Sequence, residues 1–436
     1  MTDESIDAGR CSDRGGSRFI AGYERPAGLR GQERRLLPVG EWWGAAFRSA
    51  GYALARLATL YCALAVIFWR APTTFTNPQF WAEDGVIFTA ALTDGWASLG
   101  VTIAGYLMLA QSLTAVLASY FSPIFAPTIY NFTAVALTLQ VVWLVTSPRL
   151  DLPAKPLLAI AVVIVPMGYE EIGTLCNIQW ILPIGAFVML FMRPSPSRVV
   201  LIGEAIFVGL TALSGPFSIF LAPLFLWRGL TTTGDDQRRL LLLSAIVSAA
   251  AVIQMILMAT HKAHGIIPVP YDWTLWVNLP FRKIATNFGT ANSLFQGAPG
   301  VVAGAVLLVA ALALSLLGPY RLQKLFMLYF GSAIAVAGMM KFRDALGGQQ
   351  DATRYFYVAA VFSLWFLCCL SIRFRYWSFG AVATAQVLLL QVIWDTPRNR
   401  ADFEWKAWAA KISPGEDISI PIPPAGWFVT LRDQRR

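Results

Sequence analysis

The chain has 436 residues, of which 56% are hydrophobic and only 14% are charged, whereas soluble domains carry about 25% charged residues. Repeated apolar runs of membrane-spanning length exclude a soluble globular fold and predict an all-α, polytopic membrane protein. The net charge of +9 does not indicate a nucleic-acid partner. The basic residues gather in an N-terminal arm and in short loops, and they form no basic groove with interleaved aromatic residues.

Residues 1–48 are polar and rich in arginine, glycine and serine. They contain no apolar core of the signal-peptide type, so we expect no cleavage and interpret them as a disordered, basic cytoplasmic arm. Arginines near the end of the arm are placed to contact membrane lipid.

Residues 49–394 are expected to form a transmembrane helical bundle. About eleven spans are predicted, at 52–70, 127–146, 156–169, 180–192, 199–213, 217–228, 240–260, 300–317, 323–340, 356–371 and 378–394. Several are shorter than the ~20 residues that an isolated transmembrane helix needs, so we expect neighbouring helices to shelter them.

Basic residues set the expected orientation of the bundle. One set of short connections carries or borders Lys or Arg: 147–155, 193–198, 229–239, 318–322 and 372–377. A second set contains neither: 71–126, 170–179 and 214–216. The positive-inside rule places the first set in the cytoplasm and the second set outside. This predicts a multi-pass protein of the cytoplasmic (inner) membrane with a cytoplasmic N-terminus.

The first outer loop, 71–126, is predicted to hold two juxtamembrane helices. Residues 101–121 are apolar enough to cross, but a crossing there would invert the charge alternation of every later loop. We therefore expect them to lie along the outer membrane surface, or to dip in and return. The apolar residues of 86–99 recur at helical spacing, which is typical of an interfacial helix: Phe88, Leu92, Trp96 and Leu99.

The C-terminal tail, 395–436, is predicted to be periplasmic or extracellular. It contains an alternating stretch, 418–422, followed by the turn residues Pro423-Pro424-Ala425-Gly426. This pattern predicts a small hairpin that caps the outer face.

The distinctive polar residues all fall on the outer side. Glu83 and Asp84 head the first juxtamembrane segment, Glu170 and Glu171 follow the third span, and Arg354 precedes the tenth. Ionisable residues near membrane depth indicate function, because their desolvation is costly unless they are used or paired.

Structural readings of these residues stay open at this point. The first acidic pair could cap a helix, since carboxylates favour helix N-termini. Glu170 and Glu171 could mark a span boundary or pair with Arg354, which would then be a structural counter-ion. Arg282 and Lys283 in the 261–299 loop could be a solvated face.

Neither the cysteines nor the histidines predict a metal site. The five cysteines lack CxxC spacing, and His261 and His264 have no third ligand of the right kind nearby.

The order of elements resembles the GT-C superfamily of integral-membrane glycosyltransferases, in an uncharacterised bacterial branch. The likeness covers most of the chain: one span, an outer loop opening on paired acids, juxtamembrane helices, then a large bundle. The runs that carry it are Phe80-Trp81-Ala82-Glu83-Asp84-Gly85, Gly105-Tyr106-Leu107 and Arg354-Tyr355-Phe356. The chain departs from better-known members in lacking a Lys-Pro-Pro element in the first loop and a large soluble C-terminal domain, which leaves donor and acceptor unspecified.

The resemblance implies transfer of a sugar from a polyprenyl-phosphate donor to a hydroxyl of a glycan, lipid or protein acceptor, with inversion at the anomeric carbon. Asp84 or Glu83 would be the general base. Side chains that would position donor or acceptor are Glu170, Glu171, Asn177, Gln179, Trp81, Trp180 and Tyr271. Cations that would bind the phosphate are Arg354, Lys341, Arg343, Arg282 and Lys283. A divalent cation at the acidic pair is compatible with this chemistry but not required.

Two other functions fit parts of the pattern. A transporter or flippase of a lipid-linked saccharide would use the acids as a proton or sodium site, but such proteins commonly show two related halves, and no such correspondence is apparent. A polysaccharide polymerase or ligase would use similar donors and a large outer loop, for which 261–299 is a modest candidate.

Overall fold

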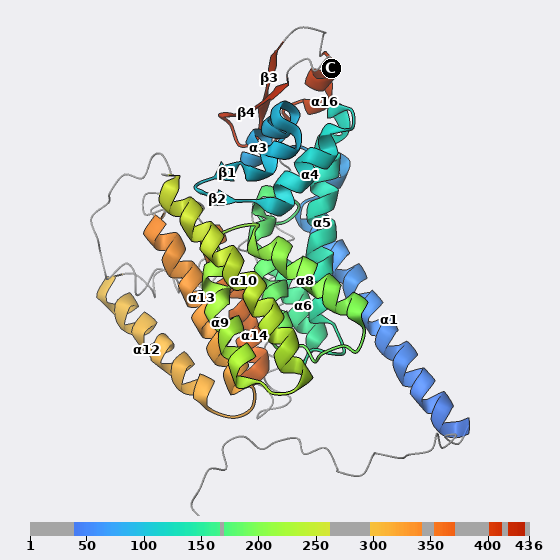
Figure 1. Ribbon diagram of the computed structural model, residues 1–436, viewed down its shortest axis with the longest axis vertical. Helices are drawn as coiled ribbons and strands as arrows, with labels where there is room; N and C mark the ends of the chain where they lie inside the picture. The colour runs from blue at the N-terminus through green and yellow to red at the C-terminus, as the bar shows by residue number, and fades with distance from the viewer. Residues whose placement is uncertain are drawn as a thin grey trace, which may run out of the picture. The chain divides into compact units, whose positions relative to one another are not determined.

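The computed structural model describes residues 39–165, 170–261, 297–341, 353–370, 401–411 and 417–431 (Figure 1). The chain divides into two compact units, Met1–Tyr52 and Ala53–Arg436. The described part of the first unit is the beginning of helix α1 (Val39–Arg70). This helix starts before residue 49 and so takes in the end of the predicted arm, the rest of which lies outside the described residues.

Helices make up most of the second unit. After α1 the described helices are, in chain order, α2 (Thr73–Thr76), α3 (Glu83–Asp94), α4 (Leu109–Ser119), α5 (Ala126–Val145), α6 (Lys155–Ile164), α7 (Leu182–Met189), α8 (Arg198–Ala212), α9 (Ser218–Thr231), α10 (Asp235–Thr260), α12 (Gly297–Leu316), α13 (Arg321–Lys341), α14 (Tyr357–Leu370) and α16 (Trp405–Ala409). Short 3-10 helices are η1 (Gly95–Gly100), η2 (Pro123–Phe125), η3 (Cys176–Trp180) and η6 (Thr353–Phe356). Two antiparallel hairpins pair β1 (Thr102–Ile103) with β2 (Tyr106–Leu107) and β3 (Ile418–Ile422) with β4 (Trp427–Leu431).

Within the described residues, 5 helices are long and apolar enough to cross a membrane: Ala50–Arg70, Pro123–Val145, Asp235–Thr260, Ala298–Leu316 and Arg321–Met340. Other predicted spans correspond to shorter apolar helices, among them α6, α9 and α14. A helix of 10 residues such as α6 is about 15 Å long, half of the ~30 Å hydrocarbon core. The protein is therefore a helical membrane protein, while the span count of about eleven stays a prediction. The predicted span 378–394 lies outside the described residues.

No single helix runs through residues 101–121. The β1–β2 hairpin fills the beginning of this segment and α4, with 11 residues, the end. The prediction that 86–99 forms an interfacial helix, with its apolar side toward the membrane, is wrong. Phe88 is fully buried, and its ring lies 5.0 Å from that of Phe80 and 6.0 Å from that of Tyr130 on α5. The apolar spacing therefore reflects packing inside the protein, and of the four residues Trp96 is the one that is mainly exposed.

The predicted C-terminal hairpin is confirmed, and it packs on α3 (Figure 1). The backbone N–H of Ala82 donates to the carbonyl of Pro423 at 2.7 Å. At the other end of the contact, the N–H of Thr430 donates to Thr89 Oγ1 at 3.1 Å. The tail thereby fixes both the start and the middle of the helix that carries the acidic pair.

Helix α10 connects two ends of the second unit. Near its C-terminus, Gln254 is fully buried and binds both backbone groups of Leu107, accepting from the N–H at 2.9 Å and donating to the carbonyl at 3.2 Å. Near its N-terminus, Arg239 binds Glu204 of α8. A rise of about 1.5 Å per residue separates Gln254 from Arg239 by about 22 Å along the helix.

Candidate functional site

The acidic pair forms the first turn of α3. Ala82, just before it, has a φ of 45°, which turns the chain sharply into the helix. Asp84 is fully buried, and its Oδ2 accepts the backbone N–H of Trp81 at 3.1 Å. Glu83 is only half-buried. Asp84 thus binds the backbone just before the helix, while Glu83 is the carboxylate with the more open surroundings.

Arg354 and Glu170 form an ion pair, although 184 residues separate them. The side chains are 31% and 32% exposed, so both sit at the edge of the packed interior, where a ligand can reach them. The Arg354 guanidinium also donates to the Tyr355 hydroxyl at 3.4 Å. Asn177 Nδ2 donates to the Glu170 carbonyl at 3.2 Å, which fixes the backbone that carries Glu170. The pairing alternative left open by the sequence is the observed one.

Glu83 lies within electrostatic range of this ion pair. It lies close enough to act electrostatically on Arg354, Tyr355 and Tyr106. The Tyr106 hydroxyl forms a hydrogen bond with the Gln179 side chain. Burial, followed by the charge of Glu83, raises the pKa of Tyr106 to about 12, so its hydroxyl stays protonated at physiological pH. Segments far apart in the chain thus bring two carboxylates, one arginine and two phenols into one group, which we call the outer cluster: Glu83, Tyr106, Glu170, Arg354 and Tyr355.

Tyr106 and Tyr355 belong to the outer cluster, although the sequence does not predict them as site residues. Both stand in short runs that the sequence offers as distinctive, one after Gly105 and one after Arg354. What places Tyr106 is its strand: Gly105 has a φ of 89°, and an added Cβ there would meet the His261 carbonyl oxygen at 2.9 Å. The tight β1–β2 turn therefore depends on glycine.

The two tryptophans among the predicted donor- or acceptor-positioning residues are largely covered by protein. Trp180 is 6% exposed, with its ring edge-on to Tyr355 at 5.2 Å and to Phe217 at 4.9 Å. Trp81 is 8% exposed. Trp180 thus supports Tyr355, and neither indole offers a broad open face.

The Glu171 side chain lies in different surroundings from that of Glu170. It is 1% exposed, and it acts electrostatically on Arg70 of α1 and Tyr357 of α14. Of the remaining predicted residues, Tyr271, Arg282, Lys283 and Arg343 lie outside the described residues, and Lys341 ends α13 with its side chain outside them.

Within the described residues, no group of three or more His, Cys, Asp or Glu side chains is placed to hold a metal ion. The carboxylates of the outer cluster are arranged around cationic and phenolic groups instead.

Comparison with family models, with curated proteins and with solved structures finds no match to this chain.

Proposed function

We propose that the chain is a membrane glycosyltransferase of the GT-C type, which moves a sugar from a polyprenyl-phosphate donor to a hydroxyl acceptor on the outer face of the cytoplasmic membrane. The observation that carries the proposal is the outer cluster. A half-buried carboxylate, Glu83, lies within electrostatic range of an arginine that is paired near the protein surface with another carboxylate, Glu170. Base and phosphate ligand are the two groups that sugar transfer from a lipid phosphate requires.

In the proposed reaction Glu83 accepts the proton of the acceptor hydroxyl. The acceptor oxygen forms a bond to the anomeric carbon while the bond from that carbon to the phosphate oxygen breaks. The phosphate leaves with the bonding electron pair. A single displacement of this kind inverts the anomeric centre. General-base catalysis typically contributes 10²–10⁴-fold in rate. Asp84 positions Glu83 by holding the turn before α3 through the Trp81 N–H.

Arg354 binds the donor phosphate in this proposal. Arginine presents the same planar fork to carboxylates and to phosphates, so Glu170 occupies the phosphate-binding face of Arg354 before the donor arrives. The partial exposure of the pair supports such an exchange. The Tyr106 and Tyr355 hydroxyls lie beside it as neutral hydrogen-bond donors for sugar or phosphate oxygens.

The outer cluster and the arginine-rich connections lie at opposite ends of α10, which supports an enzyme that acts on the outer face. The cluster is built from the first loop, the 170–180 connection and the approach to α14, whereas the arginine-rich connections meet at the other end of α10. Nucleotide sugars are confined to the cytoplasm, so a donor on the outer side must be a lipid-linked sugar.

The test is a comparison of envelope glycans in cells that lack the chain and in cells that carry variants. We expect wild type to restore a sugar modification that Glu83→Gln cannot restore. Asp94→Asn is the matched control, because it removes a carboxylate at the exposed, opposite end of α3 and should behave as wild type. Equal glycan profiles with Glu83→Gln and wild type, at equal protein levels, would refute the assignment.

The same cells distinguish a transporter. A transferase that is lost leaves its sugar donor on the outer leaflet, open to an added glycosidase. A lost flippase leaves the donor in the inner leaflet, protected from that enzyme. Protection of the accumulated donor would replace the transferase proposal with the transport one.

A further inference from the structure

Ala82, the residue before the acidic pair, has a backbone conformation that L-amino acids rarely adopt. Its φ is 45° and its ψ is −116°, which lies outside the regions allowed to a residue with a Cβ atom. Such a conformation costs free energy and persists only where the surrounding structure over-determines it. Ala82 is 6% exposed, so protein contacts hold it. These contacts therefore decide where Glu83, the next residue, is placed.

Residues near the end of the chain contact Ala82 and the segment before it. The Ala82 N–H donates to the Pro423 carbonyl at 2.7 Å. Two positions earlier, the Phe80 ring lies edge-on to the Trp405 ring, with the ring centres 4.7 Å apart. Trp405 is 2% exposed, so this contact is part of the packed interior. The approach to α3 is thus held from the C-terminal side of the chain.

The buried face of the β3–β4 hairpin holds the other side of Ala82. Ile422 and Val429 are 1% and 0% exposed, and a Cβ added at Gly85 would lie 2.6 Å from Ile422 Cδ1. Further along α3, the Thr430 N–H donates to Thr89 Oγ1 at 3.1 Å. Residues 401–411 and 417–431 together therefore grip the chain before, at and after Ala82. We call them the C-terminal clamp.

We infer that the C-terminal clamp holds Glu83 in the outer cluster, with Ala82 as the positioning residue. While the clamp is docked, Ala82 keeps its strained conformation. When the clamp leaves, Ala82 relaxes to a negative φ, which redirects the start of α3 and withdraws the Glu83 carboxylate from Arg354. The consequence for catalysis rests on the proposed function, whereas the coupling between docking and the Ala82 turn does not.

Ala82→Gly tests the coupling through the sign of its effect. Glycine adopts this conformation without strain, which favours the docked state by about 150-fold at the upper end of the usual cost. The lost methyl contact and the added freedom of glycine in the undocked chain reduce this gain by about 13-fold. Hydrogen exchange at the Thr430 amide should therefore slow by about tenfold. Unchanged or faster exchange would refute the inference.

Ala90→Gly is the matched control for this substitution. Ala90 lies inside α3, where glycine destabilises a helix relative to alanine. Exchange at Thr430 should therefore not slow in Ala90→Gly. Equal slowing in both variants would show that glycine acts other than by relief of strain at Ala82, and this outcome would also refute the inference.

Ile422→Ala releases the clamp from the hairpin side. Loss of these buried atoms should accelerate exchange at Thr430 by at least about 30-fold. The Trp81 amide reports the turn around Ala82, because it donates to Asp84 Oδ2 of the same turn. Coupling predicts that exchange at Trp81 accelerates by the same factor as at Thr430. Unchanged exchange at Trp81 would show that the turn keeps its shape without the clamp.

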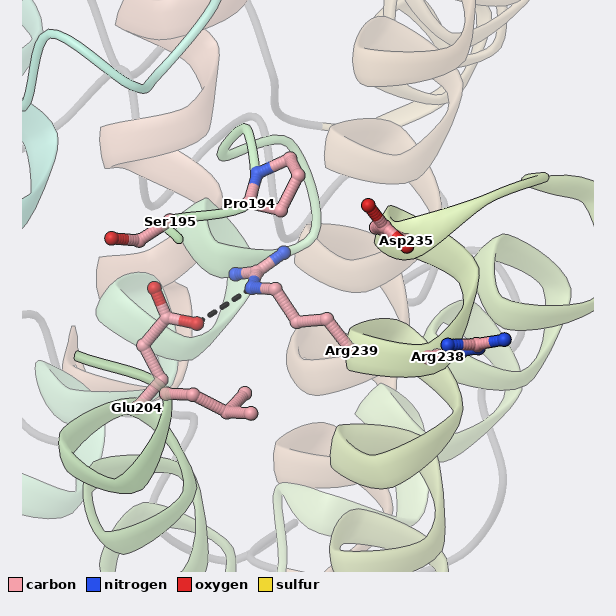
Figure 2. Close-up of a pocket in the computed structure, with 7 residues that line it drawn as sticks. Pro194, Ser195, Glu204, Asp235, Arg238 and Arg239 are labelled. Atoms are coloured by element: carbon pink, nitrogen blue, oxygen red, sulfur yellow. Dashed lines mark hydrogen bonds and ion pairs between the residues drawn. The ribbon is translucent and has the colours of Figure 1, made fainter. Parts of the chain in front are cut away.

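Glu204→Gln controls for a general loss of stability. Glu204 of α8 lies beside the N-terminal end of α10 and pairs with Arg239, which points at it in Figure 2, at 2.6 Å. Local opening of the clamp does not require global unfolding, so this variant should leave exchange at Thr430 and Trp81 unchanged. Acceleration equal to that in Ile422→Ala would mean that both amides exchange by global unfolding, which contradicts a separately opening clamp.

Sugar transfer by the full chain in proteoliposomes separates this inference from the proposed function. Across wild type, Ile422→Ala and the double variant Ile422→Ala with Ala82→Gly, kcat should follow the docked population that Thr430 exchange reports. The KM for the donor should stay near the wild-type value, because the clamp acts on the base. A kcat that ignores the docked population would refute the positioning role. Absence of transfer by wild type would refute the proposed function, and the exchange results would still decide the coupling.

Discussion

Gly85 is the point at which the C-terminal hairpin touches α3 most closely. A Cβ added there would lie 2.6 Å from Ile422 Cδ1, 2.9 Å from the Phe428 carbonyl oxygen and 3.0 Å from Val429 Cγ2. The two side-chain atoms belong to buried residues, and the oxygen is part of the backbone. The hairpin therefore cannot accommodate a methyl group by rotating one side chain.

Gly85→Ala sets two effects against each other. Alanine raises the intrinsic stability of a helix by about 1 kcal/mol relative to glycine. Overpacking of a tight contact costs about 1–3 kcal/mol. Since two of the three contacts lie below 3.0 Å and one of these is with backbone, we take the upper end of the steric cost, which then exceeds the gain by about 2 kcal/mol and shifts the docking equilibrium of the hairpin about 30-fold toward the undocked state.

Hydrogen exchange at the Thr430 amide measures this shift, because that N–H is bonded to Thr89 of α3 and exchanges when the hairpin leaves. Exchange should accelerate by about 30-fold in Gly85→Ala. Gly100→Ala is the control, since nothing lies within 4 Å of its added Cβ. Unchanged exchange at Thr430 in Gly85→Ala would show that the close contact does not dock the hairpin.

Three further outcomes follow from the described contacts. Glu204→Gln removes the buried ion pairs of Glu204 with Arg149 and Arg239 and should lower the free energy of unfolding by about 3 kcal/mol. Asp151→Asn, at an exposed site, should change it by less than about 0.5 kcal/mol. Equal unfolding curves for the two variants would show that these ion pairs do not stabilise the fold. Hydrogen bonds from the Glu404 backbone and from the Asn77 and Gln79 side chains lower the pKa of Asp402, so its stabilising contribution is present above the unfolded value of about 3.9 and is lost as pH falls through the lower folded value. The stability difference between wild type and Asp402→Asn should therefore shrink below about pH 4, and a difference that grows on acidification would contradict this sign. In a cysteine-free background on intact cells, an impermeant maleimide should label Asp94→Cys and not Arg198→Cys, and the reverse pattern would place the outer cluster in the cytoplasm.

Local patterns in the sequence predict local structure well here. The acidic pair marks the start of α3 because carboxylates stabilise the exposed N–H groups of a first turn, and α3 begins at Glu83. Alternation in 418–422 followed by a turn predicts a hairpin, and the β3–β4 hairpin forms there.

Long-range pairing is what the sequence leaves undetermined. Glu170 and Glu171 are adjacent and chemically alike, yet one meets Arg354 and the other lies near Arg70. No local pattern in the sequence distinguishes the two partners. The spacing of Phe88 and its neighbours similarly shows that the helix has an apolar face, but not whether lipid or protein covers that face. Tyr106 enters the outer cluster through the contact of Leu107 with Gln254, two residues 147 positions apart.

The most direct measurement of the central claim is a transfer assay in proteoliposomes. The donor is the polyprenyl-linked lipid fraction extracted from cells that lack the chain, and the products are followed by mass spectrometry. Wild type and Asp94→Asn should release polyprenyl phosphate and glycosylated acceptor in equal amounts, while Glu83→Gln and Arg354→Gln should release neither. Intact donor after incubation with wild type, or turnover by Glu83→Gln at the wild-type rate, would contradict a sugar-transfer role for the outer cluster.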